Sequence, residues 1–202
     1  METFEAIYSR RSIKQFDPEH QLTDAETTKL FEAAIQAPTS FNIQHWRFVL
    51  IKDAELRRTI RKELGNDQAQ MTDASLLVLM TADRDAWKKS PERYWQNAPK
   101  EVADLLVGWM GPFHEGREWL QRDEAQRSIG MAMQTLMLAA KAMGYDSCPM
   151  IGFDIEAVAK LINLPDDHVM GPMAAIGKGT KEAWPKPGQL SLNELLVTDR
   201  FA

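Results

Sequence analysis

The chain has 202 residues, of which 44% are hydrophobic and 26% charged, and its formal net charge is -5 at pH 7. This length suits one substantial core rather than two domains, and the composition is that of an ordinary globular protein. An acidic chain offers no long-range attraction to nucleic acid or to an anionic membrane surface, so neither is an expected partner.

Cys148 is the only cysteine, which excludes an internal disulfide and permits a reducing compartment. The first residues show no basic stretch followed by an apolar run, so we expect no secretory leader. The longest apolar stretch, residues 129–143, is interrupted by Gln134 and Lys141 and is shorter than the roughly 20 residues of a membrane span. We therefore expect a cytoplasmic protein.

The first half of the chain predicts two helices and a strand. Thr23 and Glu26 form a capping-box pattern that begins a helix through Gln36, and Pro38 prevents its continuation. Residues 47–51 predict a strand, and residues 53–64 predict a charged helix that Gly65 ends.

The remaining elements alternate in the same way. Residues 75–80 form an apolar run, typical of a strand that is buried on both faces. A section rich in Trp and Arg, punctuated by Pro91 and Pro99, is predicted to be helical, and long and short helices are predicted over 123–144 and 155–164. With a further strand at 170–176, the pattern indicates an α+β sandwich in which helices cover a central sheet.

A basic cluster, residues 10–14, follows an amphipathic segment with Phe4, Ile7 and Tyr8, so we expect it where a first helix ends. The cluster combines guanidinium forks, an ammonium and a hydroxyl donor, which are the groups that grip phosphate oxygens. It therefore predicts a phosphate-monoester ligand. Basic residues at the end of a helix also stabilise the helix dipole while lying in water, and on these residues alone both interpretations stand.

Four motifs then occur in order along the chain. Residues 37–48 read Ala-Pro-Thr-Ser-Phe-Asn-Ile-Gln-His-Trp-Arg-Phe, and matching stretches follow at 148–153, 176–178 and 184–186. With the basic cluster in front, this set resembles the nitroreductase family, the FMN-dependent NAD(P)H oxidoreductases, over essentially the whole chain. Within that family the chain resembles the DrgA-type proteins that are linked to reduction of quinones and nitrophenols.

The resemblance implies a nitroreductase-like three-layer sandwich with a mainly antiparallel sheet covered by helices, and an intertwined homodimer. A single FMN-binding domain would span residues 1–202. The leucine-rich extension from about 187 to 202 would pack on the partner subunit. From the residues alone, a terminal strand or helix packed on its own chain remains the alternative.

The resemblance also implies an FMN site with NAD(P)H as cosubstrate. Arg10 and Ser12 would bind the FMN phosphate from one side and Lys186 from the other, with Arg11 anchoring the same region. Lys14 would lie near the pyrimidine edge of the flavin, where a positive charge in a partly dry site favours hydride acceptance. The further implied cofactor-binding residues are Pro38, Thr39, Ser40, Asn42, Gln44, Gln70, Pro149, Met150, Ile151, Gly152, Gly177 and Lys178.

In the family the loop with Ser40 and Asn42 comes from the opposite subunit, and backbone N–H groups, here of Ile151 and Gly152, address flavin N5. The chemistry would take place at N5, so no side chain is expected to be catalytic in its own right.

Structural alternatives exist for several of these residues. Lys14 could pair with Asp17 or Glu19 at the surface. Asn42 could bridge its own turn. Residues 149–152 could form an ordinary strand-to-helix connection with Asp154 as the N-cap, and this is compatible with flavin binding.

Two positions depart from the family pattern. His45 stands where a proline is usual, which could add a titratable group. A basic pair after Pro185 is reduced to Lys186 alone, with Lys178 as a possible substitute, and this puts the exact phosphate contacts in doubt.

Neither the four histidines nor Cys148 show zinc-ligand spacing, so we expect no metal. No Gly-x-Gly-x-x-Gly motif follows a strand, which fits transient docking of NAD(P)H rather than a Rossmann site. Residues 108–116 are aromatic and glycine-rich. They predict either a mobile substrate lid for flat quinones and nitroaromatics or a packed corner.

The sequence thus predicts an FMN-dependent NAD(P)H oxidoreductase that reduces quinones and nitroaromatic compounds by a ping-pong mechanism. Two rivals remain at this stage: another flavin reaction on the same fold, such as dehalogenation or flavin fragmentation, and a non-enzymatic flavin-binding protein.

Overall fold

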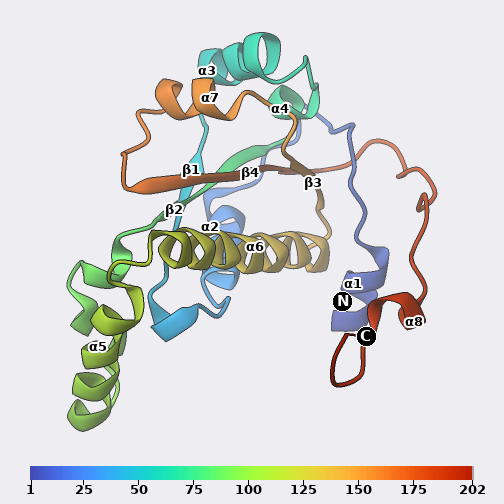
Figure 1. The fold of residues 1–202 in the computed structure, drawn as a ribbon. Helices are drawn as coiled ribbons and strands as arrows, with labels where there is room; N and C mark the ends of the chain where they lie inside the picture. The colour runs from blue at the N-terminus through green and yellow to red at the C-terminus, as the bar shows by residue number, and fades with distance from the viewer. Residues whose placement is uncertain (202) are drawn as a thin grey trace.

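An antiparallel sheet forms the centre of the computed structural model, which describes residues 1–201 (Figure 1). Within these residues the sheet has four strands in the order β1-β2-β4-β3. They are β1 (Trp46–Leu50), β2 (Leu76–Asp83), β3 (Asp146–Met150) and β4 (His168–Gly177). The register places Phe48 opposite Met80 and Cys148 opposite Ala175.

β2 is buried along its whole length, as its apolar run predicts. Successive side chains of a strand point to opposite faces. Leu76, Val78 and Met80 accordingly belong to one core cluster, whereas Leu77 and Leu79 belong to the other. The two faces of the sheet therefore each carry their own core.

Helices cover both of these faces (Figure 1). On one face lie α2 (Asp24–Ala34) and α6 (Glu118–Ala142). On the other lie α3 (Ala54–Thr59), its π-helical continuation Ile60–Leu64, α4 (Gln70–Asp73) and α7 (Ile155–Leu161). The expected three-layer sandwich with a mainly antiparallel sheet is confirmed.

The remaining helices lie at the two ends of α6 (Figure 1). In this view α1 (Thr3–Ser9) and α8 (Leu192–Leu195) both appear toward one end of α6, and α1 contacts α6. α5 (Lys100–His114) extends from the other end, beyond short 3-10 turns at Ala86–Lys88 and Pro91–Trp95. No helix in the part of the chain that the structure describes is long and apolar enough to cross a membrane.

The structure corrects four expected elements. β3 is a strand whose bounds were not predicted, since only a strand-to-helix connection was expected at 149–152, and the section around Pro91 forms short 3-10 turns instead of a regular helix. α6 begins at Glu118 rather than at 123, directly after Gly116 turns the chain with a φ of 70°. α7 stops at Leu161 instead of 164, because Asn163 adopts a left-handed φ of 52°.

Candidate functional site

The basic cluster begins where α1 ends, as expected, and continues as an extended chain beside the sheet. Ser12 forms a parallel bridge with Ser147 of β3, and the Ile13 N–H donates to the Ser147 carbonyl at 3.1 Å. Phe16 forms an antiparallel bridge with Gly179. The cluster is thus fixed between β3 and the segment that follows β4.

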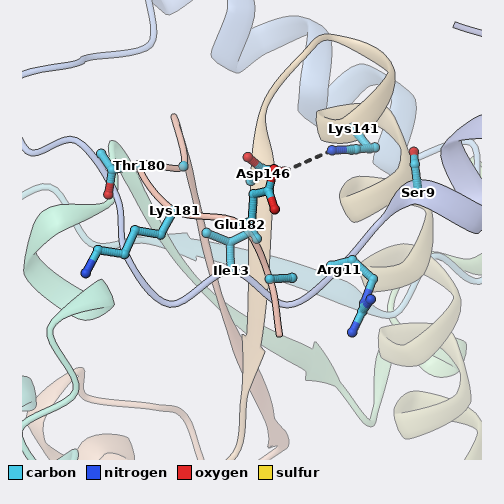
Figure 2. Close-up of a pocket in the computed structure, with 10 residues that line it drawn as sticks. Ser9, Arg11, Ile13, Lys141, Asp146, Thr180, Lys181 and Glu182 are labelled. Carbon is cyan, nitrogen blue, oxygen red and sulfur yellow. Dashed lines mark hydrogen bonds and ion pairs between the residues drawn. The ribbon is translucent and has the colours of Figure 1, made fainter. Parts of the chain in front are cut away.

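Because this stretch is extended, its side chains alternate between two cavities. Arg11 and Ile13 line a cavity of about 380 Å³ near Lys141 and Asp146, which form an ion pair at 3.0 Å (Figure 2). Ser12 and Lys14 line a smaller cavity of about 140 Å³. Arg11 Nη2 donates to the Trp184 carbonyl at 2.6 Å and so holds a residue of the smaller cavity in place. That Arg11 anchors the phosphate region of FMN stays a prediction.

The smaller cavity carries two cations, Lys14 and Lys181, against one carboxylate, Glu182, so its lining can hold an anionic group. Residues 181–184 form its far wall and bring in Lys181, a cation that the sequence analysis missed because it lies in no motif. Arg10 Nη1 is buried and has no hydrogen-bond partner among residues 1–201, and the same holds for Ser147 Oγ. A buried guanidinium nitrogen without an acceptor is unfavourable, and a phosphate oxygen would satisfy it.

Arg10 and Lys14 also act on the neighbouring strand. Burial raises the pKa of the Cys148 thiol, and the positive charges of Lys14 and Arg10 oppose that rise. Both cations therefore lie close enough to β3 to act electrostatically on the Cys148 thiol. No ion pair of Lys14 with Asp17 or Glu19 occurs among the described residues, so the surface-pair alternative is not what the structure adopts.

The end of β3 forms the next part of the candidate site. Met150 is buried, whereas Pro149, Ile151 and Gly152 are exposed, Ile151 to 71%. Asp154 caps α7 by accepting from the Ala157 N–H at 2.9 Å. The connection into a helix is thus real, and it leaves Ile151 and Gly152 on the surface.

Four expected site residues, Gln70, Gly177, Lys178 and Lys186, do not line either cavity. Gln70 is 4% exposed and donates to Gln68 Oε1 at 3.0 Å, behind the end of β3. Gly177 is buried where a Cβ would come within 3.0 Å of the Ser75 nitrogen. Lys178 is exposed beyond it, as is Lys186 in the terminal segment.

The loop of Pro38, Thr39, Ser40, Asn42 and Gln44 lies at the other end of the molecule. Asn42 Nδ2 donates to the Tyr94 carbonyl at 2.8 Å, so its side chain does not bridge its own turn. Gln44 N–H donates to Thr39 Oγ1 at 3.0 Å, and Phe41, Asn42 and Gln44 all have positive φ. The loop is therefore tightly folded against the turns that precede α5.

Helix α6 separates this loop from the basic cluster. Next to the loop, His45 contacts Ser128 on α6, whereas the cavity of Arg11 contains Lys141 near the end of the same helix. Thirteen residues of helix correspond to about 20 Å. One chain therefore does not bring Ser40 and Asn42 to Arg10.

His45, which replaces the usual proline, is fully buried with Nδ1 3.0 Å from Ser128 Oγ. Burial, reinforced by the nearby charge of His114, lowers the pKa of His45 to about 4. Burial also lowers the pKa of His114. Both imidazoles are therefore neutral at physiological pH.

Residues 108–116 belong to α5 as far as His114 rather than forming a loop. With Phe41 and Arg117, the side chains of Trp109, Pro112 and Phe113 line an apolar cavity of about 330 Å³. The Phe41 and Phe113 rings are 5.3 Å apart between centroids. The cavity adjoins the loop of Ser40 and Asn42 through Phe41, and it can accept a flat aromatic molecule.

One acidic cluster was not anticipated from the sequence. Ligand atoms of Asp83, Asp167 and His168 lie within 4.8 Å of one another. Lys89 Nζ binds Asp83 at 2.8 Å and Asp167 at 2.6 Å. A lysine ammonium thus already lies between the two carboxylates of this cluster. The cluster lies where the end of β2 pairs with the start of β4.

Comparison with known proteins gives consistent results. The Nitroreductase family profile matches residues 7–178. Protein DrgA of Synechocystis is 65% identical over 97% of this chain and 95% of its own, and MhqN of Bacillus subtilis, described as an NAD(P)H nitroreductase, is 32% identical over 88% of each. A nitroreductase of Exiguobacterium sibiricum in complex with FMN superposes with a TM-score of 0.89 at 27% identity, over 98% of this chain and 97% of that one.

These matches confirm the resemblance drawn from the four motifs. The prediction of FMN and NAD(P)H agrees with the cofactor in the Exiguobacterium structure and with the description of MhqN. Sequence, fold and basic cavity lead to one assignment: this chain belongs to the Nitroreductase family.

Proposed function

We propose that this protein is an FMN-dependent NAD(P)H oxidoreductase that reduces quinones and nitroaromatic compounds by a ping-pong mechanism. The observation that carries the proposal is the buried guanidinium nitrogen of Arg10, which has no partner among residues 1–201, in the same basic cluster as Ser12 and Lys14, which line a cavity. In a member of this family, that arrangement fits the phosphate of FMN.

The chain supplies binding and orientation, while bound FMN would supply the capacity to take hydride from NAD(P)H and to pass electrons to an acceptor. Arg10, Ser12 and Lys14 would bind the phosphate end and the adjoining pyrimidine edge. Arg11 would keep residues 181–184 in place, and Lys186 would approach from the same terminal segment. The exposed turn of Ile151 and Gly152 would contact the ring.

We further propose that a second copy of this chain completes the site. The separation of the basic cluster from the loop of Ser40 and Asn42 along α6 supports this, since one chain holds only half of the expected contacts. The exposed apolar side chains of the terminal segment support it as well. They are Trp184, Leu190, Leu192, Leu195, Leu196, Val197 and Phe201.

The apolar cavity beside Phe41 would then receive the electron acceptor. Its walls are aromatic and its rim carries Arg117, so it suits a flat ring with oxygen substituents. If the loop lies over the partner's cofactor, this cavity lies next to the flavin ring. One shared location for nucleotide and acceptor would enforce a ping-pong order, because the two could not be bound together.

The purified protein should be yellow, or should become yellow with FMN. Arg10→Ala should weaken FMN binding by about tenfold or more, because a charge-assisted contact is lost. Arg58→Ala is the matched control, since Arg58 on α3 pairs with Glu55 in the outer layer and should leave FMN binding unchanged. Protein that stays colourless after FMN is added contradicts the proposal.

A kinetic experiment tests the reaction order. NADH or NADPH should bleach the bound chromophore under anaerobic conditions without any acceptor, and a quinone added afterwards should restore it. Steady-state double-reciprocal plots should give parallel lines. Intersecting lines would contradict the ping-pong order, and no bleaching by either nucleotide would favour a different flavin reaction.

A further inference from the structure

Two side-chain amides meet one backbone carbonyl at the end of β3. Gln68 Nε2 donates to the Gly152 oxygen at 2.9 Å, and Asn66 Nδ2 donates to the same oxygen at 3.1 Å. A carbonyl oxygen has two lone pairs, so these two donors use its accepting capacity. Both come from the short segment between the π-helical turn and α4.

The rest of the turn is also hydrogen-bonded, with two exceptions. The Phe153 N–H donates to the Ile151 carbonyl at 2.9 Å, and the Asp154 N–H donates to the Leu64 carbonyl at 2.8 Å. Within residues 1–201, the N–H groups of Ile151 and Gly152 make no such bond. Both residues are exposed, so the turn presents two donors outward.

The side-chain amides of Gln68 and Asn66 are themselves restrained by further contacts and by backbone conformation. Buried Gln70 donates to Gln68 Oε1 at 3.0 Å, which fixes which end of the Gln68 amide faces Gly152. Gln68 Nε2 also donates to the Gly65 carbonyl at 3.1 Å. Asn66 is held in a left-handed conformation with a φ of 53°. The Gly152 carbonyl is thus fixed by prearranged groups.

A glycine needs such restraint, because its backbone is the most permissive of any residue. A Cβ at Gly152 would lie 3.5 Å from Gln68 Nε2, so the amide packs directly against it. Fixing the carbonyl limits rotation about Gly152 and with it the direction of the neighbouring N–H groups. Donors that are oriented before the ligand arrives need no reorganisation on binding.

We propose that Asn66 and Gln68 are positioning residues that aim the N–H groups of Ile151 and Gly152 at an acceptor nitrogen of the flavin ring. Gln70 orients Gln68 through the bond to Gln68 Oε1. This inference rests on the proposed function, since it needs FMN in the basic cavity.

The test compares FMN with 5-deaza-FMN, in which carbon replaces the ring nitrogen N5. Binding is followed by flavin fluorescence, which needs no turnover. The wild-type protein should bind FMN about tenfold more tightly than 5-deaza-FMN, because one hydrogen bond is lost. In Gln68→Leu and Gln68→Glu that ratio should fall to about twofold, mainly through weaker FMN binding.

Gln126 offers the matched control. Gln126 Nε2 donates to the Met170 carbonyl at 2.9 Å, which is the same type of bond at another part of the sheet. Gln126→Leu and Gln126→Glu should keep the wild-type ratio. Thermal unfolding of all variants separates a loss of stability from a loss of discrimination.

The outcomes distinguish this inference from the function on which it rests. Wild-type protein that binds neither flavin overturns the proposed function. Tight FMN binding with a ratio near one in the wild type, or a wild-type ratio in folded Gln68 variants, overturns the inference alone. If the Gln68 variants do not fold, Asn66→Gly removes one of the two donors, and its ratio should fall to about fivefold or below.

Discussion

His45 illustrates how a single buried side chain responds to solvent conditions. Ser128 Oγ donates to the Glu124 carbonyl at 2.8 Å, so it accepts from His45 Nδ1–H. His45 Nε2 is buried without a partner among residues 1–201. A proton at that nitrogen would be a buried charge, which is why the pKa of His45 falls to about 4.

Acid should therefore destabilise the protein through His45. An unfolded histidine has a pKa near 6.5 and takes up its proton first. The contribution of His45 to the free energy of unfolding is fully present above about pH 6.5. It falls as the pH drops toward the folded pKa of about 4 and then levels off. The full loss is roughly 3 kcal/mol, and His114 adds to it in the same direction.

His45→Asn keeps an N–H donor toward Ser128 and does not titrate. We expect this variant to lose much less stability than the wild type between pH 7 and pH 4.5, measured by urea unfolding. Equal losses in the two proteins would mean that His45 is not the responsible group.

Individual residues also mark where sequence-based prediction of the site succeeds and fails. Ser12 and Lys14 line one cavity, in keeping with their shared motif, while binding of FMN by Arg10, Ser12 and Lys14 stays a prediction. Gln70 could not be placed, since its partner Gln68 belongs to no motif and only the folded chain brings them together. Lys181 reaches the cavity because Arg11 holds the segment behind it, a contact between residues 173 positions apart.

At the scale of elements, β4 depends on a close approach to α6. A bulge places Gly171 and Pro172 opposite Met80 of β2. A Cβ at Gly171 would lie 2.8 Å from Ile129 Cγ2 and 2.9 Å from the Met80 carbonyl oxygen. The second of these is backbone and has little room to yield.

Gly171→Ala should destabilise the protein by about 1–3 kcal/mol, because the strand and α6 would have to move apart. Gly108→Ala is the matched control: Gly108 is an exposed residue of α5 where a Cβ meets nothing within 4 Å. Alanine there should stabilise by about 0.5–1 kcal/mol through helix propensity. Denaturant unfolding measures both, and a neutral Gly171→Ala would contradict this description of the bulge.

Most elements could be predicted from sequence, and the failures have physical reasons. The run 75–80 predicted β2 because both faces of that strand are buried. β3 was missed because Asp146–Met150 contains Asp, Ser and Pro, which are rare inside strands. Pro149 is tolerated there because β3 is an edge strand of the described sheet.

For the whole molecule, the decisive feature is that α6 keeps the two halves of the expected site apart. No pattern within one chain reveals that separation, since the motifs lie in order along the sequence. The family resemblance implied it by assigning the loop of Ser40 and Asn42 to the opposite subunit, and the contacts of His45 and Lys141 at different points of one helix give its physical basis.

If the halves are shared across a symmetric dimer, two defective chains should complement each other. Arg10→Ala damages the basic cluster, and Asn42→Gly removes the loop side chain while tolerating its φ of 55°. Each homodimer should bind FMN poorly. When the two chains are refolded together in equal amounts, about a quarter of the sites should recover, because half of the dimers are mixed and each has one intact site. Titration with FMN measures this, and no recovery would place both halves in the same subunit.

Residues 11–14 alternate between two cavities, so the number of residues in this stretch matters as much as their chemical types. A single residue inserted or deleted in this stretch would rotate every following side chain by half a turn. Lys14 would then point toward the compartment of Lys141 and Asp146, and Ile13 would face the ligand. A conservative replacement leaves each side chain facing its own cavity, whereas the insertion of one residue exchanges the two cavities for every side chain that follows.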